Sequence, residues 1–277
     1  MKIAEKIDDM RKLRRRLTEP VGFVPTMGYL HEGHLSLVRK ARTENPSAVV
    51  SIFVNPMQFG PQEDFNSYPR NTQRDLALLD KAGTDLVFIP QADEMYPQPF
   101  SARVEIGKVT ERLEGAARPG HFRGVTTVCA KLFNIIQPQR AYFGQKDAQQ
   151  AIVIKKMVTA LNMNIEIVTL PTVREPDGLA LSSRNTYLNP SERRAALVLY
   201  QALSLAQQLY ANGEKNAERL RQQMAGLIQQ QPLASIDYVS IANAETLDEL
   251  DTVKPPALVS LAVKIGRTRL IDNIVIQ

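Results

Sequence analysis

The apolar positions of the first 170 residues follow two alternating patterns. Short runs such as "AVVSIFV" (48–54) are almost continuously apolar and β-branched, which is typical of strands buried on both faces of a parallel sheet. Segments such as "TQRDLALLDKAG" (72–83) repeat their apolar positions every three or four residues, which predicts helices with one buried face. Strands that alternate with helices in this way predict an α/β domain with a doubly wound, Rossmann-like parallel sheet.

The two patterns also give the order of the expected elements. Strands are expected at 21–24, 48–54, 85–90, 141–144 and 165–170. Helices are expected at 34–44, 72–83, 125–136 and 147–162. In an open sheet of this kind ligands bind at the carboxyl ends of the strands, so the segments that follow the strands are the candidate functional segments.

The N-terminal segment combines an apolar stripe with the densest basic run of the chain. Apolar residues recur there at helical spacing, which predicts an amphipathic helix: Ile3, Ile7, Met10, Leu13 and Leu17. The run "RKLRRR" (11–16) then falls largely on the solvated face of that helix. A nucleic-acid-binding patch is the alternative, and it would require aromatic side chains among the arginines as stacking surfaces.

The pattern changes after residue 170. A polar stretch (171–185) precedes one long amphipathic helix at 189–213, which opens with a capping pattern, and a second helix at about 214–230. Three strand-like runs follow, at 236–242, 257–265 and 268–276. The chain is therefore expected to form two domains, a Rossmann-like domain at 1–176 and a smaller α+β domain at 177–277, with a hinge near 174–190.

Composition and charge narrow the class of protein. No apolar run reaches the roughly 18 residues that a membrane-spanning helix needs, and the N-terminus lacks the apolar core of a signal peptide. One cysteine, Cys129, cannot form an internal disulfide, and its place in an apolar helix predicts a structural role. We expect a cytoplasmic protein. Its net charge of +5 favours an anionic partner such as a nucleotide, a small carboxylate or a nucleic acid.

Two of the three histidines stand in the turn "TMGYLHEGH" (26–34), directly after the strand expected at 21–24. A helix N-terminus in this position has free N–H groups that attract phosphate. Glycines beside the histidines let the backbone approach a ligand, and both imidazoles can donate N–H bonds to phosphate oxygens. We interpret His31 and His34 as a phosphate-binding pair.

A metal-binding pair and incidental surface histidines are the alternatives for this turn. A zinc site would need further ligands, and the chain offers only His121 and Cys129 besides its carboxylates. The shortage of further ligands favours phosphate binding over a metal site.

Longer strings identify a family. "FVPTMGYLHEGH", "VSIFVNPMQFG", "LEGAARPGHFRGV", "YFGQKDAQQ" and "DGLALSSRN", in this order and at this spacing, resemble the pantothenate synthetase (pantoate–β-alanine ligase) family of the HxGH nucleotidyltransferase-like superfamily. The resemblance covers nearly all of the first 190 residues and extends weakly to "RLIDN" (269–273). Gln145 stands where many members of the family have Glu.

The resemblance implies an ATP-dependent ligase of coenzyme A biosynthesis. It would condense (R)-pantoate with β-alanine through pantoyl adenylate and release pantothenate, AMP and pyrophosphate, with Mg²⁺ accompanying ATP and no organic prosthetic group. It also implies a homodimer formed through the larger domain. We expect no nucleic-acid partner, because no aromatic residue stands within "RKLRRR", and no membrane partner, because no apolar run is long enough to span a bilayer. Another enzyme of the superfamily, such as a nucleotidyltransferase or a short aminoacyl-tRNA synthetase, is the alternative.

The chemistry of such a ligase fits the residue types in these strings. A carboxylate is already a nucleophile at neutral pH, so the first step needs positive charge and donors around the triphosphate rather than a base. His34 is the first candidate for catalysis, either as a stabiliser of phosphate charge or as a proton donor. His31, Lys146 and Arg184 are the further catalytic candidates.

The resemblance also assigns ATP-binding residues in four segments. They are Met27, Gly28, Tyr29, Leu30, His31, Glu32, Gly33 and His34; Gly144, Gln145, Lys146 and Asp147; Val173; and Leu181, Ser182, Ser183 and Arg184. Asp147 is expected to cap a helix, and the resemblance adds a role as Mg²⁺ ligand, which is compatible with capping. The "LSSR" loop (181–184) at the start of the smaller domain is expected to bind phosphate.

Neutral amides are the candidates for the other substrates. Asn55, Gln58 and, by the resemblance, Gln150 would bind pantoate or β-alanine, because an amide can bond to a carboxylate without neutralising it. Exposed polar positions are the alternative for the two glutamines. The string "RPGHFRGV" (118–125) is expected to form a loop, either a lid over the intermediate or an ordinary connection with a solvated His121.

Overall fold

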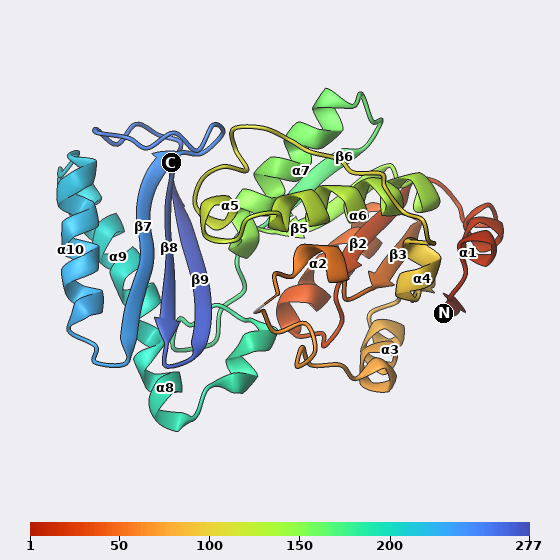
Figure 1. Cartoon of the computed structure of the whole chain (residues 1–277), viewed down its shortest axis with the longest axis horizontal. Helices are drawn as coiled ribbons and strands as arrows, with labels where there is room; N and C mark the ends of the chain where they lie inside the picture. The colour runs from red at the N-terminus through yellow and green to blue at the C-terminus, as the bar shows by residue number, and fades with distance from the viewer. Residues whose placement is uncertain (62) are drawn as a thin grey trace. The chain divides into compact units, whose positions relative to one another are not determined.

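The computed structural model describes residues 1–61 and 63–277 of the chain. These residues form two compact units. The larger unit comprises Met1–Gln145 and Gln150–Pro171, and the smaller unit comprises Lys146–Gln149 and Thr172–Gln277. Figure 1 shows the course of the chain from the N-terminus in red to the C-terminus in blue.

A six-stranded parallel sheet forms the centre of the larger unit. In spatial order its strands are β1 (Lys2–Ala4), β4 (Leu86–Phe88), β3 (Ser47–Ile52), β2 (Val21–Thr26), β5 (Arg140–Gly144) and β6 (Glu166–Leu170). Every neighbouring pair in this sheet is parallel. All six residues of β3 are buried, which explains why its sequence is apolar apart from Ser47 and Ser51.

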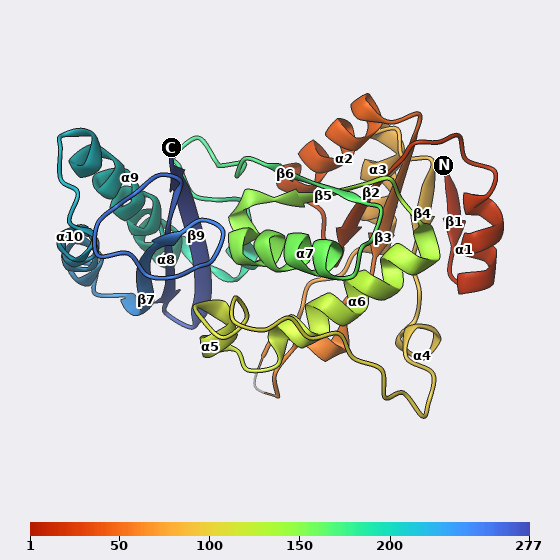
Figure 2. The same ribbon diagram turned by 90° about the horizontal axis from the view of Figure 1, so that it is seen from above.

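Helices cover both faces of this sheet. They are α1 (Ile7–Arg14), α2 (Glu32–Glu44), α3 (Thr72–Lys81), α4 (Ala92–Met95), α5 (Glu114–Ala117), α6 (His121–Ile136) and α7 (Ala148–Ala160), with short 3₁₀ helices η1 (Pro56–Gln58) and η2 (Gln145–Asp147). On β2, Phe23 contacts Phe133 of α6, whereas Val24 packs with Val38 of α2. Successive strand residues point to opposite faces, so α2 and α6 lie on opposite sides of the sheet (Figure 2). The predicted doubly wound α/β class is confirmed.

The N-terminal segment differs from the prediction. Residues Lys2–Ala4 form the edge strand β1 rather than the start of a helix, and α1 begins only at Ile7. Within the basic run, Arg14 is buried. Its guanidinium donates to the carbonyls of Ile136 (2.7 Å) and Gln137 (2.9 Å) at the end of α6. The expected solvated role is therefore wrong for Arg14, because the last carbonyls of a helix need donors that a nearby arginine can supply.

The smaller unit is an α+β structure, as predicted. Its antiparallel sheet contains β7 (Ala234–Asn243), β8 (Ala257–Ile265) and β9 (Thr268–Ile276), and its helices are η3 (Ser183–Tyr187), α8 (Pro190–Ala195), α9 (Leu197–Ala211) and α10 (Ala217–Gln229). The helix expected at 189–213 is divided into two at Ala196. Its predicted capping pattern is present, since Asn189 and Glu192 each accept the other's backbone N–H.

Within the described ranges, 1–61 and 63–277, the helices are all too short or too polar to traverse a lipid bilayer.

Candidate active site

The turn between β2 and α2 carries the histidine motif of the larger unit. Gly28 has φ +83°, and a Cβ at this position would lie 2.9 Å from Cγ2 of Ile52. Tyr29 follows with φ +49°, so two successive residues lie in the left-handed region. This turn connects the end of β2 to the start of α2, and glycine is the residue that tolerates a left-handed conformation without strain.

A buried carboxylate from another helix holds this turn in place. Asp75 of α3 is 1% exposed, and its two oxygens accept the backbone N–H groups of Tyr29 (2.6 Å) and Leu30 (2.8 Å). Burial raises the pKa of Asp75, against the effect of these two donors and of Arg74. Sequence reasoning missed this residue. The available signal was its position one turn before the fully buried Leu79, which places a charge on the buried stripe of α3.

The two histidines lie at the start of α2, as predicted. His31 is the N-cap residue, and its backbone N–H donates to Nδ1 of His34 at 3.3 Å. The two rings lie against each other with their centroids 4.0 Å apart and their planes tilted by 36°. Because Nδ1 of His34 accepts this bond, the proton of the neutral ring is on Nε2, which is the atom that can donate to an anion.

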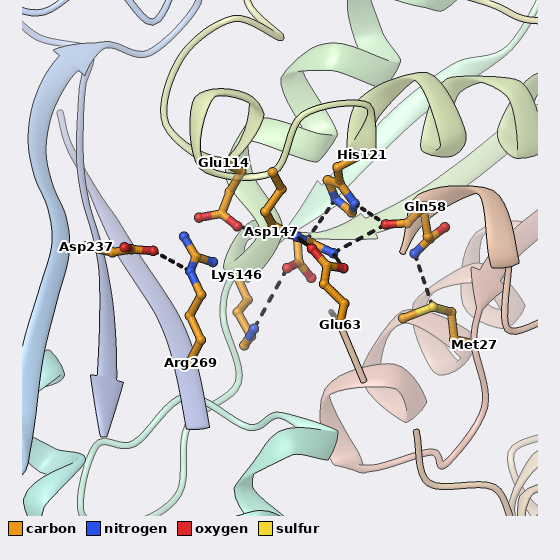
Figure 3. Close-up of polar contacts among 10 residues, drawn as sticks. Met27, Gln58, Glu63, Glu114, His121, Lys146, Asp147, Asp237 and Arg269 are labelled. Atoms are coloured by element: carbon orange, nitrogen blue, oxygen red, sulfur yellow. Dashed lines mark hydrogen bonds and ion pairs between the residues drawn. The ribbon is translucent and has the colours of Figure 1, made fainter. Parts of the chain in front are cut away.

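Two of the three predicted amides, Asn55 and Gln58, form one network after β3. Asn55 is 1% exposed, and its amide nitrogen donates to Gly124 O and to Oε1 of Gln58, each at 3.1 Å. Its amide oxygen accepts the hydroxyl of Tyr96 at 2.7 Å. The half-buried Gln58 amide in turn donates to Sδ of Met27 at 3.1 Å (Figure 3). The structure thus joins the histidine turn to the amide segment, whereas Gln150 lies half-buried on α7.

The start of α6 fixes the backbone of this amide segment. His121 Nδ1 donates to the carbonyl of Gln58 at 2.9 Å, and Arg118 donates to the other ring nitrogen at 3.1 Å (Figure 3). Arg118 also forms a bidentate pair with Glu63, with distances of 2.7 and 2.6 Å. The expected loop at 118–125 is wrong from His121 onwards, where α6 begins. The solvated alternative for His121 is wrong as well, since both ring nitrogens are engaged in contacts within the protein.

This arrangement makes stability depend on pH. Burial, followed by the Arg118 charge, lowers the pKa of His121 from 6.5 to about 4. Between these values the unfolded chain binds a proton that the folded chain does not. The stabilising contribution of neutral His121 is therefore fully present above pH 6.5. As the pH drops towards 4, the free energy of unfolding is expected to fall by about 3 kcal/mol.

Denaturant unfolding of the wild type and of His121→Gln across this range is the measurement. Glutamine keeps a donor for the Gln58 carbonyl but does not titrate, so the variant is expected to show a flatter profile. If the stability of the two proteins changed with pH in the same way, His121 would not be the group responsible for the pH dependence.

The predicted residues of the smaller unit come from two segments. Lys146 and Asp147 end η2, with Lys146 Nζ 3.8 Å from Oδ1 of Asp147 (Figure 3). The other segment is a hairpin in which Arg174 and Ala180 form an antiparallel bridge. Gly144, which precedes η2 in the larger unit, has open space where a Cβ would be, so sterics do not require glycine there.

The "LSSR" segment leaves this hairpin directly. Leu181 N–H donates to the carbonyl of Val173 at 3.0 Å, and Ser182 caps η3 by accepting the Arg184 N–H at 3.3 Å. Ser183 is buried, whereas Arg184 is partly exposed. Lys146 and Ser182 line one small pocket, together with residues of β9 that sequence reasoning did not select. The smaller unit therefore brings two of its predicted segments together.

Comparison with known proteins shows which family the chain resembles. The sequence profile of the family described as Pantoate-beta-alanine ligase matches residues 2–275. A pantothenate synthetase of Herpetosiphon aurantiacus is 59% identical over 276 residues, covering 99% of this chain and 100% of the relative.

Solved structures agree with the sequence comparison. A pantothenate synthetase from Thermus thermophilus superposes with a TM-score of 0.95 and 48% identity, covering 99% of both chains. The pantoate–β-alanine ligase from Francisella tularensis, solved in complex with "Beta-gamma ATP" and β-alanine, gives a TM-score of 0.82 and 36% identity and covers 99% of this chain and 97% of its own.

Proposed function

The chain belongs to the pantoate–β-alanine ligase family, and we propose that it condenses (R)-pantoate with β-alanine at the expense of ATP. The family match over residues 2–275 is the observation that carries this proposal. The histidine turn, the amide network and the Lys146 pocket supply residue types that this reaction needs.

In the first step, an oxygen of the pantoate carboxylate attacks the α-phosphorus of ATP. A new O–P bond forms, the bond from the α-phosphorus to the oxygen that bridges it to the β-phosphorus breaks, and pyrophosphate leaves while pantoyl adenylate remains. The attacking group needs no base, so the residues act on the phosphates. We assign His34 Nε2, His31, Lys146 and Arg184 to stabilising the negative charge of the triphosphate as pyrophosphate separates.

The remaining ATP-binding assignments rest on the same family resemblance. We propose that the backbone of the turn at 27–34 approaches the phosphates, that the segments 144–147 and 181–184 complete the phosphate site, and that Val173 bonds to adenine through its backbone. These segments contain several backbone N–H groups and small side chains, which suit close approach to a nucleotide.

In the second step, the neutral amine of β-alanine attacks the acyl carbon of the adenylate. The C–N bond forms, the bond from the acyl carbon to the phosphate oxygen breaks, AMP leaves, and the amine loses a proton. We propose that Gln58 and Gln150 bind pantoate, with Gln58 also facing β-alanine. Asn55 has its amide engaged within the protein, so we assign it to orienting Gln58 beside the substrate.

Magnesium would be held mainly by ATP itself. Its site is assigned to Asp147, whose side chain is 49% exposed beside Lys146. In the part of the chain that the structure describes, no cluster of three His, Cys, Asp or Glu residues could bind a metal unaided. One accessible carboxylate fits an ion that takes few protein ligands and several phosphate oxygens and waters. When bound, the ion would neutralise phosphate charge.

Three wider assignments belong to the same proposal. We propose a homodimer formed through the larger domain on the family resemblance, and a domain boundary near residue 176 on the change of sequence pattern after residue 170. We also place the reaction in the cytoplasm, with small molecules as partners rather than nucleic acid. The single cysteine, Cys129, is free and buried in α6, which is compatible with a reducing compartment.

Product analysis tests the proposed function. Mg-ATP is incubated with pantoate and β-alanine together and with each omitted, and AMP, pyrophosphate and pantothenate are measured. Steady AMP release that requires both substrates, in equal amounts with pantothenate, is expected. A dinucleotide-like product would instead indicate a nucleotidyltransferase, and absence of ATP cleavage with either substrate would refute the ligase assignment.

A further inference from the structure

The last strand of the smaller unit carries two adjacent polar residues that the proposed function leaves without a role. Asp272 and Asn273 belong to the string "RLIDN" and are only 2% and 4% exposed. Burial of a carboxylate and an amide in a sheet is costly unless each has partners. Their partners therefore indicate what these residues do.

Asp272 fastens the hairpin at 173–181 to β9. Its carboxylate makes a bidentate pair with Arg174, at 2.6 and 2.8 Å. The same guanidinium donates to the carbonyl of Gly178 at 3.0 Å and stacks 4.4 Å from the Tyr200 ring. One arginine thus joins the two sides of the hairpin to strand β9 and to α9.

The tip of this hairpin packs closely against Tyr200 of α9. Gly178 has φ +97°, and a Cβ there would lie 2.1 Å from Cδ1 of Tyr200. The hairpin leads directly into the segment 181–184, because Leu181 is bonded to Val173 across its base at 3.0 Å. By holding Arg174, Asp272 fixes the position of the hairpin. It thereby also fixes the position at which the "LSSR" segment begins.

Asn273 makes the corresponding connection to the other cationic segment. Its amide nitrogen donates to the backbone carbonyl of Lys146 at 2.9 Å. Its own carbonyl accepts from Arg174 at 3.3 Å, and its N–H donates to Asp272 at 2.8 Å. The two adjacent residues of β9 therefore share Arg174 as a partner, and Asn273 alone adds the bond to Lys146. Lys146, Ser182 and Asp272 line one pocket.

From this geometry we propose that Asp272 and Asn273 are positioning residues for the triphosphate. They fix the distance between Lys146 and the segment 181–184, so that the cations of both segments meet the same phosphates. The inference rests on the proposed function for the identity of the ligand. Neither residue needs to touch ATP, because each acts through the segment that it holds.

The variant Asn273→Asp tests this proposal in the full-length chain. A carboxylate has the shape of the amide but cannot donate to the Lys146 carbonyl, and it places an acceptor against that oxygen. We expect the KM for ATP to rise by about 10-fold or more and adenylate formation to slow to a similar degree. Aminolysis of added pantoyl adenylate by β-alanine should keep its rate, since that step has no triphosphate to position.

Asn243→Asp on β7 is the matched control. Its side-chain oxygen only accepts, from the N–H groups of Glu245 and Thr246, and aspartate can accept in the same way. Both half-reactions should therefore be unchanged in this variant. Thermal unfolding of both variants measures any loss of stability separately from the kinetic effect.

Two results would overturn the positioning role. One is an unchanged KM for ATP in Asn273→Asp, and the other is an equal loss in both half-reactions that follows the loss of stability. If Asn273→Asp does not fold, Arg174→Lys should show the same split between half-reactions, because lysine keeps the charge but not the bidentate geometry. A wild type without pantoate-dependent turnover would refute the proposed function instead, and calorimetric binding of ATP to the same variants would still test the positioning role.

Discussion

Replacing His34 with alanine is expected to slow pantoyl adenylate formation by about 100- to 1000-fold, the usual cost of removing one preorganised donor from a charge-developing transition state. His34 is at the first turn of α2, and its Nδ1 is occupied by the His31 N–H. In the proposed function, Nε2 is then the atom that donates to the phosphates. Pyrophosphate release in single turnover with pantoate and ATP measures the effect.

The variant should remain folded, because His34 is only partly buried and its loss leaves one N-cap N–H to water, at a cost of about 1 kcal/mol. His34→Gln separates the two possible roles of the imidazole. Its amide can still donate a hydrogen bond but cannot release a proton, so substantial recovery over alanine indicates charge stabilisation. Equal loss in both variants indicates proton donation, and near-wild-type turnover of folded His34→Ala would exclude a catalytic role.

Gly124→Ala is expected to damage the substrate site through the backbone. An added Cβ on α6 would lie 2.2 Å from the Met57 carbonyl oxygen and 2.6 Å from the Gln58 nitrogen. These atoms belong to η1 and cannot move without displacing the Gln58 amide and breaking the bond from Asn55 to the Gly124 carbonyl. We expect a loss of about 1–3 kcal/mol in the free energy of unfolding and a large rise in the KM for pantoate.

Gly226→Ala provides the matched control for this substitution. Gly226 also lies inside a helix, α10, but a Cβ there would meet nothing within 4 Å. Alanine should therefore stabilise the protein by up to about 1 kcal/mol and leave the kinetics unchanged. Urea unfolding of the two variants tests whether Gly124→Ala lowers stability and Gly226→Ala raises it. Initial rates test whether only Gly124→Ala raises the KM for pantoate. If Gly124→Ala changed neither the free energy of unfolding nor the KM for pantoate, η1 would be able to move, and packing against α6 would not fix Gln58.

The helix and strand periods of the sequence were sufficient for the fold class and most elements, because continuous and periodic apolar runs report burial directly. These periods gave wrong predictions where contacts between segments distant in the sequence decided the secondary structure. Ile3 has helical spacing but pairs in an edge strand, and the break at Ala196 is not visible in an unbroken helical period. The Pro and Gly of the string at 118–125 predict a loop, yet its second half belongs to α6, and His121 in the first turn of that helix bonds to the carbonyl of Gln58 in η1.

Sequence alone determined the family, the α/β class and the segments in which the candidate residues lie, since these depend on residue type and on spacing along the chain. The partners of those segments were decided only by the tertiary structure. Asp75 reaches a turn 45 residues away, and Asp272 reaches Arg174 across 98 residues. Periodicity can place such a carboxylate on a buried stripe, as it does for Asp75, but it does not identify the partners, because these are the donors that surround the carboxylate only after folding.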